Sequence, residues 1–144
     1  MSMNTIYDIA GSAMTAQSQR LNTVASNLAN AETPGSTPET TYRARKPVFA
    51  AVLEQTQQDL MDSTALNSAY SVEVKEIVES EAALEVRYQP DHPMANEQGN
   101  VYYPNVNVVE EMTEMMSASR NYQTNIELLS SANAMQQRLL TLGR

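Results

Sequence analysis

Residues 4–31 of this chain read NTIYDIAGSAMTAQSQRLNTVASNLANA, and side chains suited to burial recur along them at alternating spacings of three and four. Such spacing places them on one helical face and is typical of a heptad seam. The seam positions are Tyr7, Ala10, Met14, Gln17, Leu21, Val24 and Leu28. Pro34 cannot continue a helix and Gly35 turns readily, so we expect a long amphipathic helix that ends before them.

A second amphipathic helix is predicted at the other end of the chain, over residues 107–142. Pro104 interrupts the preceding segment, and Asn107 is a favoured residue for capping a new helix. The apolar face carries Val108, Met112, Met115, Tyr122, Ile126, Leu129, Ala132, Met135, Leu139 and Leu142. A helix of about 54 Å cannot bury this whole stripe against a small domain, so it needs the first helix, other subunits, or both.

The segment between the two helices shows the signs of short strands and loops. Residues 42–53 favour an extended conformation, and the polar residues 54–69 favour a loop or a short helix. Further strands are indicated by Val72 and Val74, less regularly by Ile77, by Leu84, Val86 and Tyr88, and by residues 101–103. We therefore predict an α+β fold in which the terminal helices pair as a coiled-coil-like bundle around a small β-rich middle.

The charge distribution divides the chain into the same three regions. Residues 1–34 and 105–144 each carry a net charge of −1, so −6 of the total −8 falls on residues 35–104. Nearly neutral ends are suited to packing together, whereas an acidic middle is suited to facing water. We expect an N-terminal axial helix over 1–34, a β-rich region over 35–104 and a C-terminal axial helix over 105–144.

The composition argues against several classes of protein. A net charge of −8 disfavours binding to nucleic acid or to anionic membranes, both of which need clustered Lys and Arg. The absence of Cys excludes disulfides, thiolate metal sites and a cysteine nucleophile. No window approaches the roughly 18 apolar residues of a membrane span, and no cleaved secretory signal is visible.

Residues capable of catalysis do not form a recognisable motif. His92 is the single histidine and lies between two prolines, so we interpret it as an exposed turn residue. The chain lacks a phosphate-binding glycine loop, an HExxH motif and an EF-hand loop. Arg43, Arg45 and Lys46 form a small basic cluster that could pair with acidic neighbours. We predict no enzyme activity, no catalytic or metal-binding residues, no cofactor and no small-molecule substrate.

Two segments near the ends of the chain carry a family resemblance. Residues 19–33, QRLNTVASNLANAET, are similar to the N-terminal signature of the bacterial flagellar rod and hook axial proteins, and residues 6–21 narrow the resemblance to proximal-rod proteins. Residues 104–112, 117–126 and 141–143 are similar to the C-terminal half of the same proteins. The matching motif residues are Ser26, Asn27, Leu28, Ala29, Asn30, Asn105, Val106, Arg120 and Tyr122.

The resemblance implies a structural subunit of the proximal rod in the flagellar basal body. Such a subunit would be exported by the flagellar type III apparatus without a cleaved signal peptide and would assemble helically in the periplasm to transmit motor torque. Its partners would be other rod subunits, further copies of itself, and the rod base at the membrane ring. The predicted assembly contacts are Tyr7, Ala10, Met14, Leu21, Val24 and Leu28 on the first helix and Met112, Met115, Tyr122, Ile126, Leu129 and Leu139 on the last.

An alternative class shares the acidic charge and the amphipathic helices. A cytoplasmic helical adaptor or secretion chaperone would have the same composition, but it would form a compact, closed dimer and would remain in the cell. The two hypotheses therefore differ in where the chain is found and in whether its helices assemble into an open filament.

Overall fold

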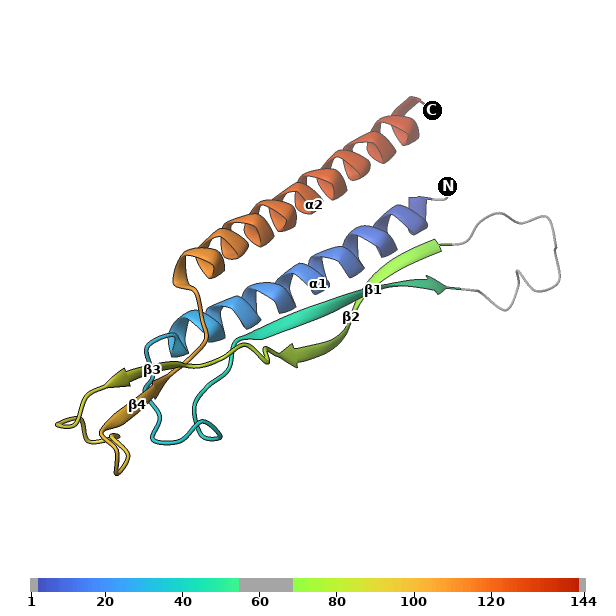
Figure 1. Cartoon of the computed structure of the whole chain (residues 1–144). Helices are drawn as coiled ribbons and strands as arrows, with labels where there is room; N and C mark the ends of the chain where they lie inside the picture. The colour runs from blue at the N-terminus through green and yellow to red at the C-terminus, as the bar shows by residue number, and fades with distance from the viewer. Residues whose placement is uncertain (1–2, 55–68, 143–144) are drawn as a thin grey trace.

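The computed structural model describes residues 3–54 and 69–142, and it consists of two long helices and two β-hairpins (Figure 1). The helices are α1, Met3–Asn30, and α2, Val108–Leu142. The strands are β1, Arg45–Glu54; β2, Ala69–Glu79; β3, Glu85–Tyr88; and β4, Asn100–Tyr103. The predicted α+β class and the helix boundaries are confirmed, while most of the polar segment 54–69 lies outside the described residues.

Helix α1 is the central element of the fold. It packs against α2 on one side and against the β1–β2 hairpin on the other, as Figure 1 shows. The two helices run antiparallel, so that the N-terminus of α1 and the C-terminus of α2 lie at the same end of the molecule. The most deeply buried apolar side chains include Ala16 and Val24 of α1, Ala118 of α2 and Val101 of β4. This thin core follows α1 along much of its length.

The ends of the helices follow from local chemistry. After α1, the Thr33 N–H donates to the Asn30 carbonyl, and Pro34 ends the helical pattern. At the start of α2, the Asn107 side-chain oxygen accepts from the backbone N–H of Val109 at 3.1 Å, which confirms the predicted cap. Gly143, which follows α2, lies outside the described residues.

The β1–β2 hairpin is antiparallel and contains one irregularity. The register runs from Arg45 opposite Glu79 to Glu54 opposite Ala69, with a shift between Val48 and Phe49. A bulge of this kind changes which side chains share a face of the sheet. It explains why Ile77 departs from the regular alternation of Val72 and Val74. The Val72 N–H donates to the Ser12 hydroxyl at 3.1 Å, which ties this hairpin to α1.

The β3–β4 hairpin lies beyond the end of α1 where Asn30 is located, and it is extended by one glycine (Figure 1). Gly35 exchanges two backbone hydrogen bonds with Tyr102, of 2.8 and 3.0 Å, and so forms a short bridge beside β4. A Cβ atom on Gly35 would collide with the Thr41 hydroxyl and would lie 3.1 Å from the Thr41 Cα. Glycine is needed here because two backbones approach closely.

Gly35→Ala is therefore expected to lower the free energy of unfolding by about 2 kcal/mol, since the added methyl group has no space beside the Thr41 backbone. Urea unfolding monitored by circular dichroism would measure the change. Gly11→Ala provides the control: nothing lies within 4 Å of a Cβ at Gly11 in α1, so that variant should gain about 0.5–1 kcal/mol from helix propensity. Equal effects of the two substitutions would contradict the steric argument.

Candidate assembly interface

The C-terminal turn of α1 is joined to β1 through the side chain of Asn27. This side chain is fully buried, with 0% exposure. Its amide nitrogen donates to the Arg45 carbonyl at 2.8 Å, and its oxygen accepts from the Arg45 N–H at 3.0 Å. The same oxygen accepts from the Tyr42 hydroxyl at 2.9 Å. Asn27 thus pairs with the start of β1 much as a neighbouring strand would.

A second asparagine connects the segments on the far side of β1. The Asn105 side-chain oxygen accepts from the Ala44 N–H at 2.8 Å, and its amide nitrogen donates to the carbonyls of Ser80 and Ala82 at 3.3 and 2.9 Å. The guanidinium of Arg43 donates to the same two carbonyls. Asn27 and Asn105 therefore hold the chain before β1 from opposite sides. We call the region around these two residues the asparagine joint.

The remaining motif residues have less central positions. The Ser26 hydroxyl lies 3.2 Å from the Tyr42 hydroxyl, and the Asn30 amide donates to the Ser26 carbonyl within the helix. Leu28, Val106 and Tyr122 are half-buried, while Ala29 and Arg120 are exposed. Asn30 therefore bonds locally within α1, whereas the partners of Asn27 lie 15 and 18 residues away.

Polar contacts between described side chains join α1 to α2. The Arg20 guanidinium lies 3.1 Å from the Glu114 carboxylate, and the Tyr7 hydroxyl donates to the Asn133 side chain. Lys46 of β1 also pairs with Glu110 of α2 at 3.1 Å, although both side chains are exposed and such pairs add little stability. These contacts set the antiparallel register of the two helices.

The residues of the predicted seam on α1 are buried within the subunit to different degrees. Ala10 and Val24 are buried, with exposures of 3% and 2%. Tyr7, Met14, Leu21 and Leu28 are half-buried. The seam of α1 is thus largely occupied within the subunit by α2 and the β1–β2 hairpin.

The structure divides the predicted stripe of α2 between two surfaces. Side chains that are at least partly buried form a row with spacings of four and three, as in a heptad seam: Glu111, Met115, Ala118, Tyr122, Asn125, Leu129 and Ala132. Glu114 and Ser119 are half-buried beside this row. Met112 and Ile126 are 56% and 47% exposed, and so lie outside this inner row. The single apolar face predicted for α2 is corrected to an inner row and a separate exposed surface.

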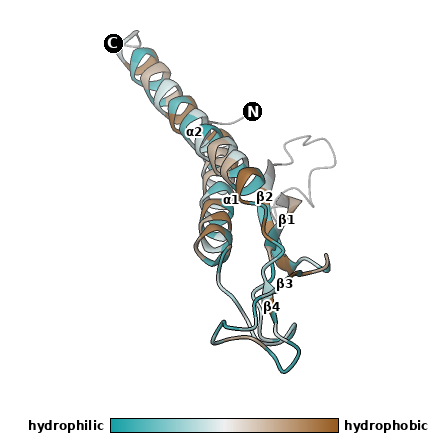
Figure 2. Ribbon diagram, turned by 60° about the vertical axis from the view of Figure 1, so that its left-hand side comes forward, coloured by the Kyte–Doolittle hydropathy of each residue, from teal (hydrophilic) through white to brown (hydrophobic). Residues whose placement is uncertain are grey.

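The exposed apolar surface of α2 has two parts. Near the start of the helix it consists of Val109, Met112 and Met116, which lie on the side of α2 opposite Ala118. Near the end it consists of Leu128, Met135, Leu139 and Leu140, which are 47–69% exposed. Figure 2 shows hydrophobic bands recurring along α2 up to its C-terminal end. Exposed large apolar side chains gathered on a helix in this way are typical of sites of association.

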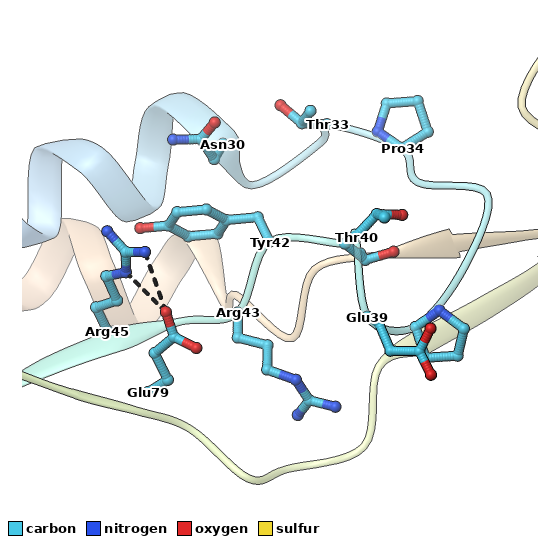
Figure 3. A pocket seen from close by; sticks show the side chains of 11 residues that line it. Asn30, Thr33, Pro34, Glu39, Thr40, Tyr42, Arg43, Arg45 and Glu79 are labelled. Carbon is cyan, nitrogen blue, oxygen red and sulfur yellow. Dashed lines mark hydrogen bonds and ion pairs between the residues drawn. The ribbon is translucent and has the colours of Figure 1, made fainter.

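A polar hollow lies below the loop that follows α1 (Figure 3). It has a volume of about 590 Å³, and its lining includes Thr33, Glu39, Tyr42, Arg43 and Arg45. Both of its cations already have partners within the chain, because Arg45 pairs with Glu79 at 3.0 Å and Arg43 donates to backbone carbonyls. The predicted pairing of the basic cluster with acidic neighbours is confirmed for Arg45 and Lys46.

The groups available for chemistry are dispersed. His92 is half-buried in a turn, where its Nδ1 accepts from the Met94 N–H at 3.1 Å. Within residues 3–54 and 69–142, no three His, Asp or Glu side chains gather in a way that could hold a metal ion. Neither of the two described helices is long and apolar enough to cross a membrane.

Comparison with known proteins gives matches at both ends of the chain. Residues 8–36 match the family described as "Flagella basal body rod protein", and residues 97–142 match "Flagellar basal body rod FlgEFG protein C-terminal". The flagellar basal-body rod protein FlgC of Escherichia coli is 44% identical over 144 residues, which cover all of both chains. The chain belongs to the FlgC family of flagellar basal-body rod proteins.

Other members of the FlgC family agree with this assignment. FlgC of Salmonella typhimurium is 42% identical over the full length of both chains. FlgC of Aquifex aeolicus is 41% identical over 123 residues, or 85% of this chain and 84% of that one. The chain is therefore a structural component of the basal-body rod. Asn27 lies in the first matched segment and Asn105 in the second, so each family region contributes one asparagine to the asparagine joint.

Proposed function

We propose that this subunit assembles helically with other rod subunits through α1 and α2 and transmits motor torque along the rod. The observation that carries the proposal is the exposed apolar surface of α2. Its last part, Leu128, Met135, Leu139 and Leu140, remains open to solvent in the single subunit. Burial of this surface by neighbouring chains would stabilise an assembly at roughly 25 cal/mol for each Å² removed from water.

The division of α2 into two surfaces suggests different tasks for the predicted contact residues. Met115, Tyr122 and Leu129 pack within the subunit and fix the direction of α2. Met112 and Ile126 face outward and are suited to contact a neighbour. Leu139 lies seven residues after Ala132, so it continues the line of the inner row, yet it is 62% exposed and is equally open to a neighbour. We infer that a neighbour binds these exposed positions with a different surface of its own, which makes the contact heterologous. A heterologous contact that does not close produces a helical filament.

The same proposal includes the route and the partners of the subunit. We infer export by the flagellar type III apparatus and attachment to the rod base at the membrane ring, in addition to contacts with rod subunits. The names of the relatives, which describe basal-body rod proteins, support this reading. A scaffolding role needs no catalytic group, and the dispersed polar groups described above agree with such a role.

Mass spectrometry of intact basal bodies, purified from the source cells after removal of the outer filament, tests the proposal. Recovery of this chain in stoichiometric amounts with other rod proteins is the expected result. Absence from basal bodies, together with a stable closed dimer in the cytoplasm, would instead support the adaptor or chaperone hypothesis.

Amide hydrogen exchange in the isolated subunit is expected to proceed at different rates in the two parts of α2. Amides near Ala118 are expected to exchange slowly, because this residue is fully buried against the rest of the fold. Amides from Ala134 to Thr141 are expected to exchange at least tenfold faster, because the side chains of these residues are exposed in the subunit. In purified rods the difference should shrink as neighbours cover the helix. Uniform slow exchange along α2 in the monomer would contradict this expectation.

A further inference from the structure

Glu111 is a buried carboxyl group at the place where α1, β1 and α2 meet. Its residue exposure is 5%, although it lies in the first turn of a helix that is otherwise exposed there. One carboxyl oxygen, Oε2, has no hydrogen-bond partner among the described residues. The side chain approaches Asn27, so it adjoins the asparagine joint. A buried carboxyl oxygen without a partner is costly when the group is ionised.

The charges around Glu111 do not offset this cost. Burial raises the pKa of the Glu111 carboxyl above its ordinary value, while Asn27 and Lys46 lower it and Glu110 and Glu114 raise it. Lys46 is already paired with Glu110, and Arg20 of α1 is already paired with Glu114. Neither cation therefore acts as a dedicated counter-ion for Glu111.

We propose that Glu111 is a proton-sensitive latch, which holds α2 against α1 and β1 more firmly when its carboxyl is neutral than when it is ionised. The folded subunit retains this proton more tightly than the unfolded chain does. The contribution to stability is therefore complete under acidic conditions and is lost as the pH rises through the folded-state pKa. The latch is a property of the single chain and does not depend on rod assembly.

Urea unfolding of the full chain at pH 5.0 and pH 7.5 tests the latch. Glu111→Gln replaces the carboxyl with a neutral group of similar shape, and Glu127→Gln removes one charge from an exposed position of the same helix. The urea midpoint of the wild type should be higher at pH 5.0. Glu111→Gln should remove at least half of that difference by raising the midpoint at pH 7.5, and Glu127→Gln should leave most of it.

Equal pH dependence in the two variants would overturn the latch, because the effect would then come from net charge alone. If Glu111→Gln does not fold, the carboxyl is titrated directly in the wild-type chain by carbon-13 NMR. A midpoint above the ordinary range for glutamate would support the latch, and one at or below that range would overturn it.

Discussion

Replacing Asn27 with alanine is expected to lower the free energy of unfolding of the subunit by about 3 kcal/mol. The substitution removes three hydrogen bonds: the Arg45 N–H and the Arg45 carbonyl lose their partner, and the Tyr42 hydroxyl keeps only its contact with Ser26. Each buried polar group that loses its partner costs about 1–3 kcal/mol. Denaturant unfolding of the purified chain measures the loss.

Asn30→Ala is the matched control for this prediction. Asn30 is the same residue type, lies on the same helix, and donates only to the Ser26 carbonyl in the preceding turn. Its replacement should change the free energy of unfolding by less than about 1 kcal/mol. If the two asparagines prove equally important, or equally unimportant, the special role assigned to Asn27 in joining α1 to β1 is wrong.

Leu139→Asp is expected to abolish rod assembly and therefore swimming. The Leu139 side chain is 62% exposed in the subunit, so the substitution should leave the fold of the monomer intact. In the proposed assembly the same position is covered by a neighbouring chain, where an unpaired carboxylate is strongly unfavourable. Motility in soft agar, measured in cells whose rod subunit is replaced by the variant, gives the readout.

Gln137→Asp introduces the same charge on the opposite side of α2 and serves as the control. It should support normal swimming if, near the C-terminal end of α2, only the side that carries Leu139 is covered. Thermal unfolding of both purified variants separates a failure to assemble from a failure to fold. Normal motility of Leu139→Asp would remove Leu139 from the assembly contacts.

The elements of this fold are readable from local patterns in the sequence. The seam from Tyr7 to Leu28 gave the length of α1, and Asn107 gave the start of α2, because helix periodicity and capping depend on residues close in the chain. The sequence also shows that Ile77 departs from the alternation of Val72 and Val74. The bulge behind it could not be located, since it depends on how β2 pairs with β1.

The face of α2 that meets α1 was harder to predict. Apolar side chains occur on more than one side of this helix, and hydropathy alone cannot tell which side is buried within the subunit. Ala118 and Glu111 are among its most buried residues, yet one is small and the other is charged. The hydrogen bonds of Asn27 could not be predicted either, because partners 15 and 18 residues away leave no local pattern in the sequence.

Among the residues that the structure describes, two hydrogen-bonded contacts connect α1 to the β1–β2 hairpin, one at Ser12 and one at Asn27. Fifteen residues separate them along the helix, or about 22 Å. A single contact would act as a pivot about which the hairpin could swing. Two contacts at this separation oppose rotation of the hairpin about either one, so the hairpin turns together with α1. If the two contacts lay closer together along α1, the hairpin would resist twisting relative to the helix less strongly, although the fold would be the same.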